Sequence, residues 1–207
     1  MRTYNLNPTL AKEAGISKRI SESGKYVGKF TRAEAVQSKK ETEGVEFAFE
    51  CVDGRSADFL SLWTFDNSGK EIQGLKMLNA IMTCLRVKKL EPVTGTVEKY
   101  SRESKSVEKF SAVVFNELLN KPIGLLLQRE EYEKYDGKID EKMNIYACFD
   151  ASSGMMAGEI LDKSTTATQL EKVLLSLQDK PLQSAKKKNT STAVDNSHFE
   201  PDSDFRF

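Results

Sequence analysis

The chain has 207 residues, of which 39 % are apolar and 30 % are charged, with 31 basic side chains balanced by 31 acidic ones. This length suits one ordinary domain or two small ones. No stretch approaches the roughly 18 uninterrupted apolar residues that cross a bilayer, and residues 1–10 lack the layout of a signal peptide. Three widely spaced cysteines form neither a disulfide framework nor a CxxC metal pair. We therefore expect a cytoplasmic protein with no membrane partner.

The balanced total hides an uneven distribution of charge along the chain. Residues 1–40 contain nine basic and three acidic side chains, which leaves +6, whereas residues 195–207 contain one basic and four acidic side chains, which leaves −3. Asymmetry of this kind points to a nucleic-acid or membrane partner, or to an acidic interaction tail. Without residues 195–207 the rest of the chain carries +3, so the neutral total does not argue against nucleic acid.

Alternation of apolar and polar residues early in the chain predicts three consecutive β-strands. They cover residues 24–36, 45–52 and 57–65. Asp53 and Gly54 favour a tight turn between the second and third strands, which predicts a hairpin. The apolar spacing then changes to the helical period, which predicts an amphipathic helix over residues 74–87.

The second half of the chain is predicted to add two strands and a second helix. Residues 92–107 are polar and are interpreted as irregular, and a short helix is expected near residues 115–119. The two strands cover residues 122–131 and 143–151, and the helix covers residues 165–177. Thr166 and Gln169 have the spacing of a capping box at the start of that helix.

Three strands, a helix and two more strands predict a mainly β fold. The order is that of the OB-fold, a five-stranded Greek-key barrel, with the helix between strands three and four and a further C-terminal helix. An α+β sandwich with the same elements is the alternative. We expect residues 1–178 to form this domain with an N-terminal extension. Residues 179–207, rich in Lys, Ser, Asn and Asp, are expected to be a disordered acidic tail.

Signatures of an enzyme are mostly missing from the sequence. The single histidine, His198, falls in the predicted tail, and neither GxxxxGK[ST] nor GxGxxG is present. Asp53, Asp58 and Asp66 could hold Mg²⁺ in a metal-dependent nuclease, yet each falls in or beside a turn, where Asp is favoured for backbone reasons. We therefore expect no enzymatic activity, no cofactor and no metal site.

The third predicted strand carries a row of aromatic residues. If Leu60 and Leu62 face the core, the opposite face presents Phe59, Trp63 and Phe65. Aromatic rings on an open sheet stack unpaired bases, at about 1–3 kcal/mol per base. The alternative is that both faces are buried, one of them by helices or by a partner subunit.

Basic residues are expected beside this aromatic face, on the first strand and on two loops. In an OB-fold, the first and last inter-strand loops flank the nucleic-acid groove. The candidate phosphate contacts are Lys25, Lys29, Arg32, Lys39, Lys40 and Lys138, and the candidate stacking residues are Trp63, Phe65, Tyr132 and Tyr135. Acidic residues in the last loop, such as Glu131 and Asp136, favour instead an ordinary solvated hairpin there.

The C-terminal segment HFEPDSDFRF places three of the eleven phenylalanines within the last nine residues. Aromatic residues in an acidic, flexible segment are typical of a short motif that docks into a partner protein. The candidate docking residues are Asp202, Asp204, Phe205 and Phe207.

This tail resembles the acidic, Phe-ended tip of bacterial and bacteriophage single-stranded-DNA-binding proteins. The segments GKYVGKFTRAEAV, WTFDNSGK, GLKMLNAIMTCL, NKPIGLLLQREEYE and MNIYACFD, within residues 24–151, are similar in layout to phage-encoded members of that group with an OB-fold. The tail departs from the pattern, because its acidic run is short and Arg206 precedes the terminal Phe207.

The resemblance implies a protein without enzymatic activity that binds single-stranded DNA in phage replication, recombination or repair, in the host cytoplasm. It also implies a tail that recruits replication or recombination proteins and competes with DNA for the groove. A second hypothesis is a structural or adaptor protein whose aromatic sheet face forms a homodimer.

Overall fold

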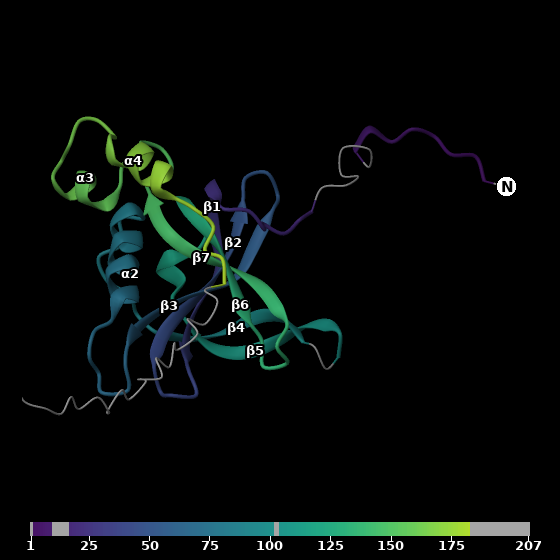
Figure 1. The fold of residues 1–207 in the computed structure, drawn as a ribbon, viewed down its shortest axis with the longest axis horizontal. Coiled ribbons are helices and arrows are strands. Elements are labelled where there is room, and N and C mark those ends of the chain that lie inside the picture. The colour runs from purple at the N-terminus through teal and green to yellow at the C-terminus, as the bar shows by residue number, and fades with distance from the viewer. Residues whose placement is uncertain (1, 10–16, 102–103, 183–207) are drawn as a thin grey trace, which may run out of the picture.

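The computed structural model describes residues 2–9, 17–101 and 104–182 and shows a mainly β fold (Figure 1). In these residues one antiparallel sheet contains seven strands. The strands are β1 (Gly24–Gln37), β2 (Glu43–Cys51), β3 (Ser56–Phe65), β4 (Val93–Ser101), β5 (Ser106–Val114), β6 (Pro122–Glu133) and β7 (Ile139–Phe149). The helices are α2 (Gln73–Cys84), η1 (Asn116–Leu118, a 3-10 turn), α3 (Ala157–Leu161) and α4 (Gln169–Ser176). No described helix has the length and apolar character needed to span a membrane.

The long strand β1 organises the sheet, because it pairs with three other strands. It pairs with β2 along most of its length, with β6 over Gly24–Lys29, and with β5 at Glu34. Thr31 is an extra residue in the β1–β2 register, and such a bulge bends a strand and increases its twist. At Gly28 a Cβ would lie 2.1 Å from the Glu50 carbonyl oxygen, so this close strand approach requires glycine. The bend lets β1 pair with β2 along one edge and with β6 and β5 along the other.

The main core lies between the sheet and α2. Phe30 and Phe47 pack with ring centroids 4.5 Å apart, and Phe49 meets Phe30 edge to face. Leu78 and Ile81 of α2 are buried against this cluster. These two residues belong to the apolar stripe whose helical spacing predicted the helix, so burial of one face explains why it forms.

The strands β3 and β7 lie side by side without a hydrogen-bonded ladder between them in the described residues, and the segment before β1 links them. The Ile20 amide donates to the Ser56 carbonyl at 2.8 Å, and the Ser56 amide donates to the Lys18 carbonyl at 2.7 Å. The Arg19 guanidinium reaches the Glu141 carbonyl at 3.5 Å. Ile20 is fully buried, which anchors this link in the core.

The sequence predictions for the first three strands, for β6 and for α2 are confirmed to within a few residues, and β7 starts four residues earlier than predicted. The interpretation of residues 92–107 as irregular is wrong, because they form β4 and the start of β5. The sheet therefore has two strands more than the five predicted. Among the described side chains of this hairpin, only those of Val97 and Val114 are buried. A hairpin exposed on both faces lacks the apolar alternation that predicts a strand.

The C-terminal helix also differs from its prediction. It begins at Gln169 with Thr168 as its N-cap, so the expected capping box of Thr166 and Gln169 is not formed. The Glu159 carboxylate of the unpredicted helix α3 accepts hydrogen bonds from the amides of Thr168 at 2.6 Å and Gln169 at 3.0 Å. A carboxylate from another element thus satisfies the free amides that begin α4.

Residues 179–182, assigned from the sequence to the tail, continue along the edge of β6. The Lys180 amide donates to the Arg129 carbonyl at 2.8 Å, and the Glu131 amide donates to the Lys180 carbonyl at 2.9 Å. The Lys180 ammonium pairs with the Glu130 carboxylate. The four candidate docking residues Asp202, Asp204, Phe205 and Phe207 lie outside the described residues.

Candidate nucleic-acid interface

The aromatic face predicted for the third strand is present on β3. Leu60 and Leu62 are buried, whereas Phe59 is 62 % exposed, Trp63 is 37 % exposed and Phe65 is half-buried. This side of the strand is therefore not covered within the described chain, and the alternative that helices of the same chain bury this face does not hold for Phe59.

Trp63 lies at the end of β3 that is nearest the β1–β2 loop. It is opposite Gly44 in the ladder, where a Cβ would lie 2.9 Å from the indole ring, so glycine leaves space for the ring. The loop after β1 carries Lys39 and Lys40, both exposed. The structure thus brings two predicted cations and a predicted stacking residue to the same end of the sheet.

Phe59 sits at a bulge in β3. Asp58 and Phe59 together face the single residue Ala48 of β2, and Phe59 has a φ of 60°. Positive φ is unfavourable for a bulky side chain, at about 1–3 kcal/mol, and such residues cluster at binding sites. The guanidinium of Arg32 lies 5.6 Å from the centre of the Phe59 ring. The bulge and this cation hold the ring out from the sheet.

Arg32, predicted as a phosphate contact, is instead 8 % exposed and paired with two carboxylates. Its Nε lies 3.2 Å from Oε1 of Glu34, and its Nη2 lies 3.1 Å from Oε1 of Glu46. Lys99 of β4 adds a contact of 2.6 Å to the same Glu34 oxygen, and the Ser61 hydroxyl donates to Glu46 at 3.2 Å. Arg32 is therefore not available to a phosphate, and its place beside Phe59 makes it a positioning residue.

A groove of about 530 Å³ separates β3 from the β6–β7 hairpin, and it contains two exposed aromatic rings. Phe59 lines one side and Tyr132 the other, and the charged residues of the lining are the basic Arg19 and Lys142 and the acidic Asp58, Asp140 and Glu141. The Tyr132 hydroxyl donates to Asp140 at 3.2 Å, and the Lys142 ammonium lies 5.9 Å from the Tyr132 ring centre. The hydroxyl of Tyr132 is thus held by Asp140, and the Lys142 ammonium lies over one face of its ring.

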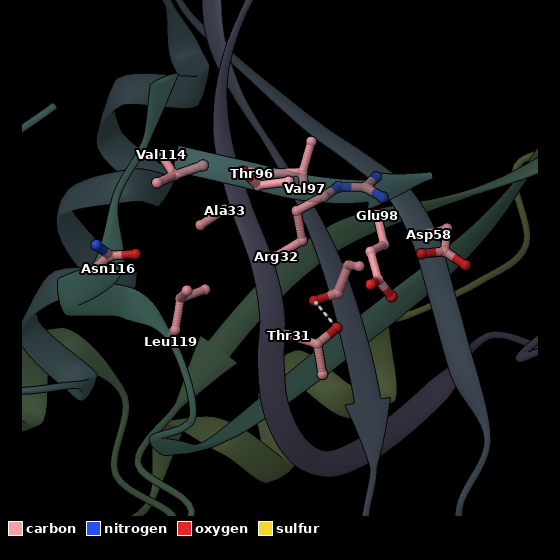
Figure 2. Close-up of a pocket in the computed structure, with 11 residues that line it drawn as sticks. Thr31, Arg32, Ala33, Asp58, Thr96, Val97, Glu98, Val114, Asn116 and Leu119 are labelled. Atoms are coloured by element: carbon pink, nitrogen blue, oxygen red, sulfur yellow. Dashed lines mark hydrogen bonds between the residues drawn. The ribbon is translucent and has the colours of Figure 1, made fainter. Parts of the chain in front are cut away.

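A second hollow of about 480 Å³ adjoins the first at the bulge, because Asp58 lines both (Figure 2). Its walls come from β1, from the β4–β5 hairpin and from the residues around η1. In the view of Figure 2, the charged side chains Arg32, Glu98 and Asp58 lie toward one end. The two hollows together form a concave path from the β4–β5 hairpin, past Phe59, to the β6–β7 hairpin.

Several predicted site residues lie away from this path. Lys29 pairs with Glu50 at 3.5 Å and lines a separate hollow, and Lys25 pairs with Glu171 of α4 at 3.9 Å. The residues at the tip of the β6–β7 hairpin are exposed: Tyr135 has no contact that orients it, and Lys138 pairs with Asp136 at 3.3 Å. Lys25 and Lys29 therefore do not join Phe59 and Tyr132 in one groove.

Three groove residues were absent from the candidates derived from the sequence. Phe59 belongs to the predicted aromatic row, but alternation does not reveal the bulge that exposes it. In the sequence, Arg19 contributes only to the charge of +6 over residues 1–40. No sequence pattern places Lys142 on a strand, since it precedes residue 143, the predicted start of β7.

Two of the three aspartates considered for Mg²⁺ instead stabilise turns. Asp53 accepts hydrogen bonds from the side chain and the amide of Arg55, which hold its pKa at about 2. Asp66 accepts from the Ser68 hydroxyl and from the Lys70 and Ser68 amides, which lowers its pKa. Within residues 2–9, 17–101 and 104–182, no group of three or more His, Cys, Asp or Glu is placed to hold a metal ion.

The fold and the site define a class by themselves: a mainly β protein with an open, concave surface lined by aromatic and charged side chains. No family model matches the sequence, and no curated protein matches it either. The assignment of function therefore depends on the chemistry of these residues.

Proposed function

We propose that this chain is a single-stranded-DNA-binding protein with a modified OB-fold. Support comes from the order β1, β2, β3, α2, β6, β7, in which β1 pairs with both β2 and β6 while β7 lies beside β3. That is the order of an OB-fold with the β4–β5 hairpin inserted after the helix. OB-folds are often only partly open barrels, and the link through residues 18–20 fits such an arrangement.

The observation that carries the proposal is the exposed pair Phe59 and Tyr132 in one groove. Unpaired bases stack on such rings whatever their sequence, whereas the rings have no access to bases inside a duplex. Arg19 in the groove, with Lys39 and Lys40 at the Trp63 end, supplies cations for the phosphates, and Lys142 joins them by exchanging Glu130, its partner at 3.0 Å, for a phosphate. Binding of this kind needs no catalytic group and no cofactor.

The C-terminal tail completes the proposal. Its acidic residues, among them Asp202 and Asp204, compete with DNA phosphates for the basic residues, and Phe205 and Phe207 dock into replication or recombination proteins. The charge of −3 over residues 195–207 supports this role, and the resemblance to phage proteins supports an origin in phage DNA metabolism in the host cytoplasm.

The test is titration of a fluorescent oligo(dT) with the full chain and with its Phe59→Ala variant at low salt. We expect the wild type to bind, and the variant to bind about 5- to 150-fold more weakly, because one stacking contact is worth about 1–3 kcal/mol. Leu175→Ala is the control, because Leu175 is exposed on α4, away from the groove. Absence of binding at low salt, with and without residues 195–207, would contradict the proposal.

The second candidate is a structural or adaptor protein that dimerises through the aromatic sheet face. The same exposed rings, Phe59 and Trp63, support it. Light scattering and the fluorescence of Trp63, the single tryptophan, separate the two functions. Quenching of Trp63 by single-stranded DNA supports DNA binding, whereas a dimer in which DNA leaves Trp63 unquenched supports the adaptor.

A further inference from the structure

The hollow beside the bulge has the size and position of a second binding site on the proposed DNA path. Its volume of about 480 Å³ lies within the range of small-molecule sites. It meets the Phe59 groove at Asp58, so a strand whose base stacks on Phe59 passes the mouth of this hollow. The charges and hydrogen-bonding groups of the hollow decide whether the phosphate or the base of a nucleotide enters it.

The charges around the hollow disfavour a phosphate. Its single basic side chain, Arg32, is already paired with the carboxylates of Glu34 and Glu46. The other two charged residues of its lining, Asp58 and Glu98, are acidic. Lys99 and Lys109 come from the adjoining hairpin, but Lys99 is paired with Glu34, and Lys109 lies 3.8 Å from Glu98. A neutral base therefore fits better than a phosphate.

The hydrogen-bonding groups of the hollow select among the bases. Asp58 is exposed, and within the described chain its carboxylate has no hydrogen-bond or ion-pair partner. A carboxylate only accepts hydrogen bonds, so it recognises the exocyclic amino group of cytosine, adenine or guanine. Thymine and uracil have no amino group, and the donor on the same edge, the ring N3–H, lies between two carbonyl oxygens, which a carboxylate repels. Val97, Val114 and Leu119 supply apolar contact for the ring (Figure 2).

We propose that this hollow is a base-specific subsite, in which Asp58 accepts a hydrogen bond from the amino group of an unpaired cytosine, adenine or guanine. The inference rests on the proposed function. Stacking alone binds all bases alike, whereas Asp58 adds a preference for bases that carry an amino group. Phe59 then holds the neighbouring base, since Asp58 and Phe59 are adjacent at the bulge.

The test compares the affinity of the full chain for oligo(dC), oligo(dU) and oligo(dT) of equal length at pH 8. Cytosine and uracil differ in the amino group, and uracil and thymine differ only in a methyl group. We expect oligo(dC) to bind about fivefold or more tightly than oligo(dU), and oligo(dU) to match oligo(dT), because one specific base contact supplies at least that discrimination.

Asp58→Asn should bring the ratio of the oligo(dC) affinity to the oligo(dU) affinity close to 1. The ratio is compared instead of the separate affinities, because removal of a negative charge strengthens binding to every oligonucleotide alike. Glu171→Gln, a change of the same charge on α4, should leave the ratio unchanged. Equal binding of oligo(dC) and oligo(dU) by the wild type would overturn the inference and leave the proposed function intact, as would a preference that survives in Asp58→Asn. Failure to bind any of the three would overturn both.

Discussion

Phe59 and Arg32 show how one extra residue in a strand changes the role of a side chain. Strict alternation from Lys25 and Lys29 would place Arg32 on the core side of β1 with Phe30. The bulge at Thr31 shifts this phase, and Arg32 lies beside Phe59 above a pair of carboxylates. The composition of the strand predicts a basic strand, but the bulge depends on the register with β2, which a single sequence does not display.

Glu159 stabilises the fold through the hydrogen bonds that its carboxylate accepts. The amides of Thr168, Met156 and Gln169 all donate to its carboxylate, and these bonds hold its pKa at about 2. Because the folded pKa lies below the ordinary value of 4.5, the carboxylate stabilises the fold above about pH 4.5, and this contribution is lost as the pH falls toward 2.

We expect Glu159→Gln to lower the melting temperature by several degrees at pH 7 and to flatten the loss of stability between pH 4.5 and 2. Glutamine keeps the size of the side chain but lacks the charge that strengthens the three hydrogen bonds. Thermal unfolding followed by circular dichroism across this pH range measures both effects. Glu133→Gln, on the exposed end of β6, is the control. A variant with the same pH profile as the wild type would contradict the role given to Glu159.

The elements differ in how far the sequence predicts them. Strands with one buried face, such as β2 and β3, show clear alternation, and α2 shows the helical period, because each has a single face toward the core. The β4–β5 hairpin is exposed over most of both faces, so its sequence carries little apolar pattern. Its position beside the hollow at Asp58 depends on contacts with β1 that are distant in the sequence.

The β4–β5 hairpin is joined to β1 by the pairing of Glu34 with Val114 and by the ion pair of Lys99 with Glu34. The Glu34 side chain is only 2 % exposed and contacts two cations. We expect Glu34→Gln to lower the free energy of unfolding by about 3 kcal/mol or more, because it leaves Arg32 and Lys99 short of a buried partner. Urea denaturation measures the change.

Glu98→Gln is the matched control for this change. Glu98 is an exposed residue of the same hairpin, and its contact with Lys109 is 3.8 Å long, so its replacement should change stability by less than about 1 kcal/mol. Similar effects of the two variants would show that the buried cluster around Glu34 does not anchor the hairpin.

At the scale of the whole molecule, the end of the chain differs in charge from the residues before it. Residues 1–194 carry +3 and residues 195–207 carry −3. If the acidic end competes with DNA for the basic residues, its removal should strengthen binding most at low salt, where charges interact over the longest distance. A tail that only recruits partner proteins would leave DNA affinity unchanged.

We therefore expect the chain ending at residue 194 to bind oligo(dT) more tightly than the full chain at about 20 mM salt. The two affinities should converge as the salt concentration rises toward about 300 mM, because screening weakens both the DNA contacts and the competition. A full-length variant with Asp195, Glu200, Asp202 and Asp204 replaced by Asn or Gln separates charge from length, since it keeps every residue of the tail. Competition by charge predicts that this variant binds as the truncated chain does, and binding like that of the wild type would contradict it.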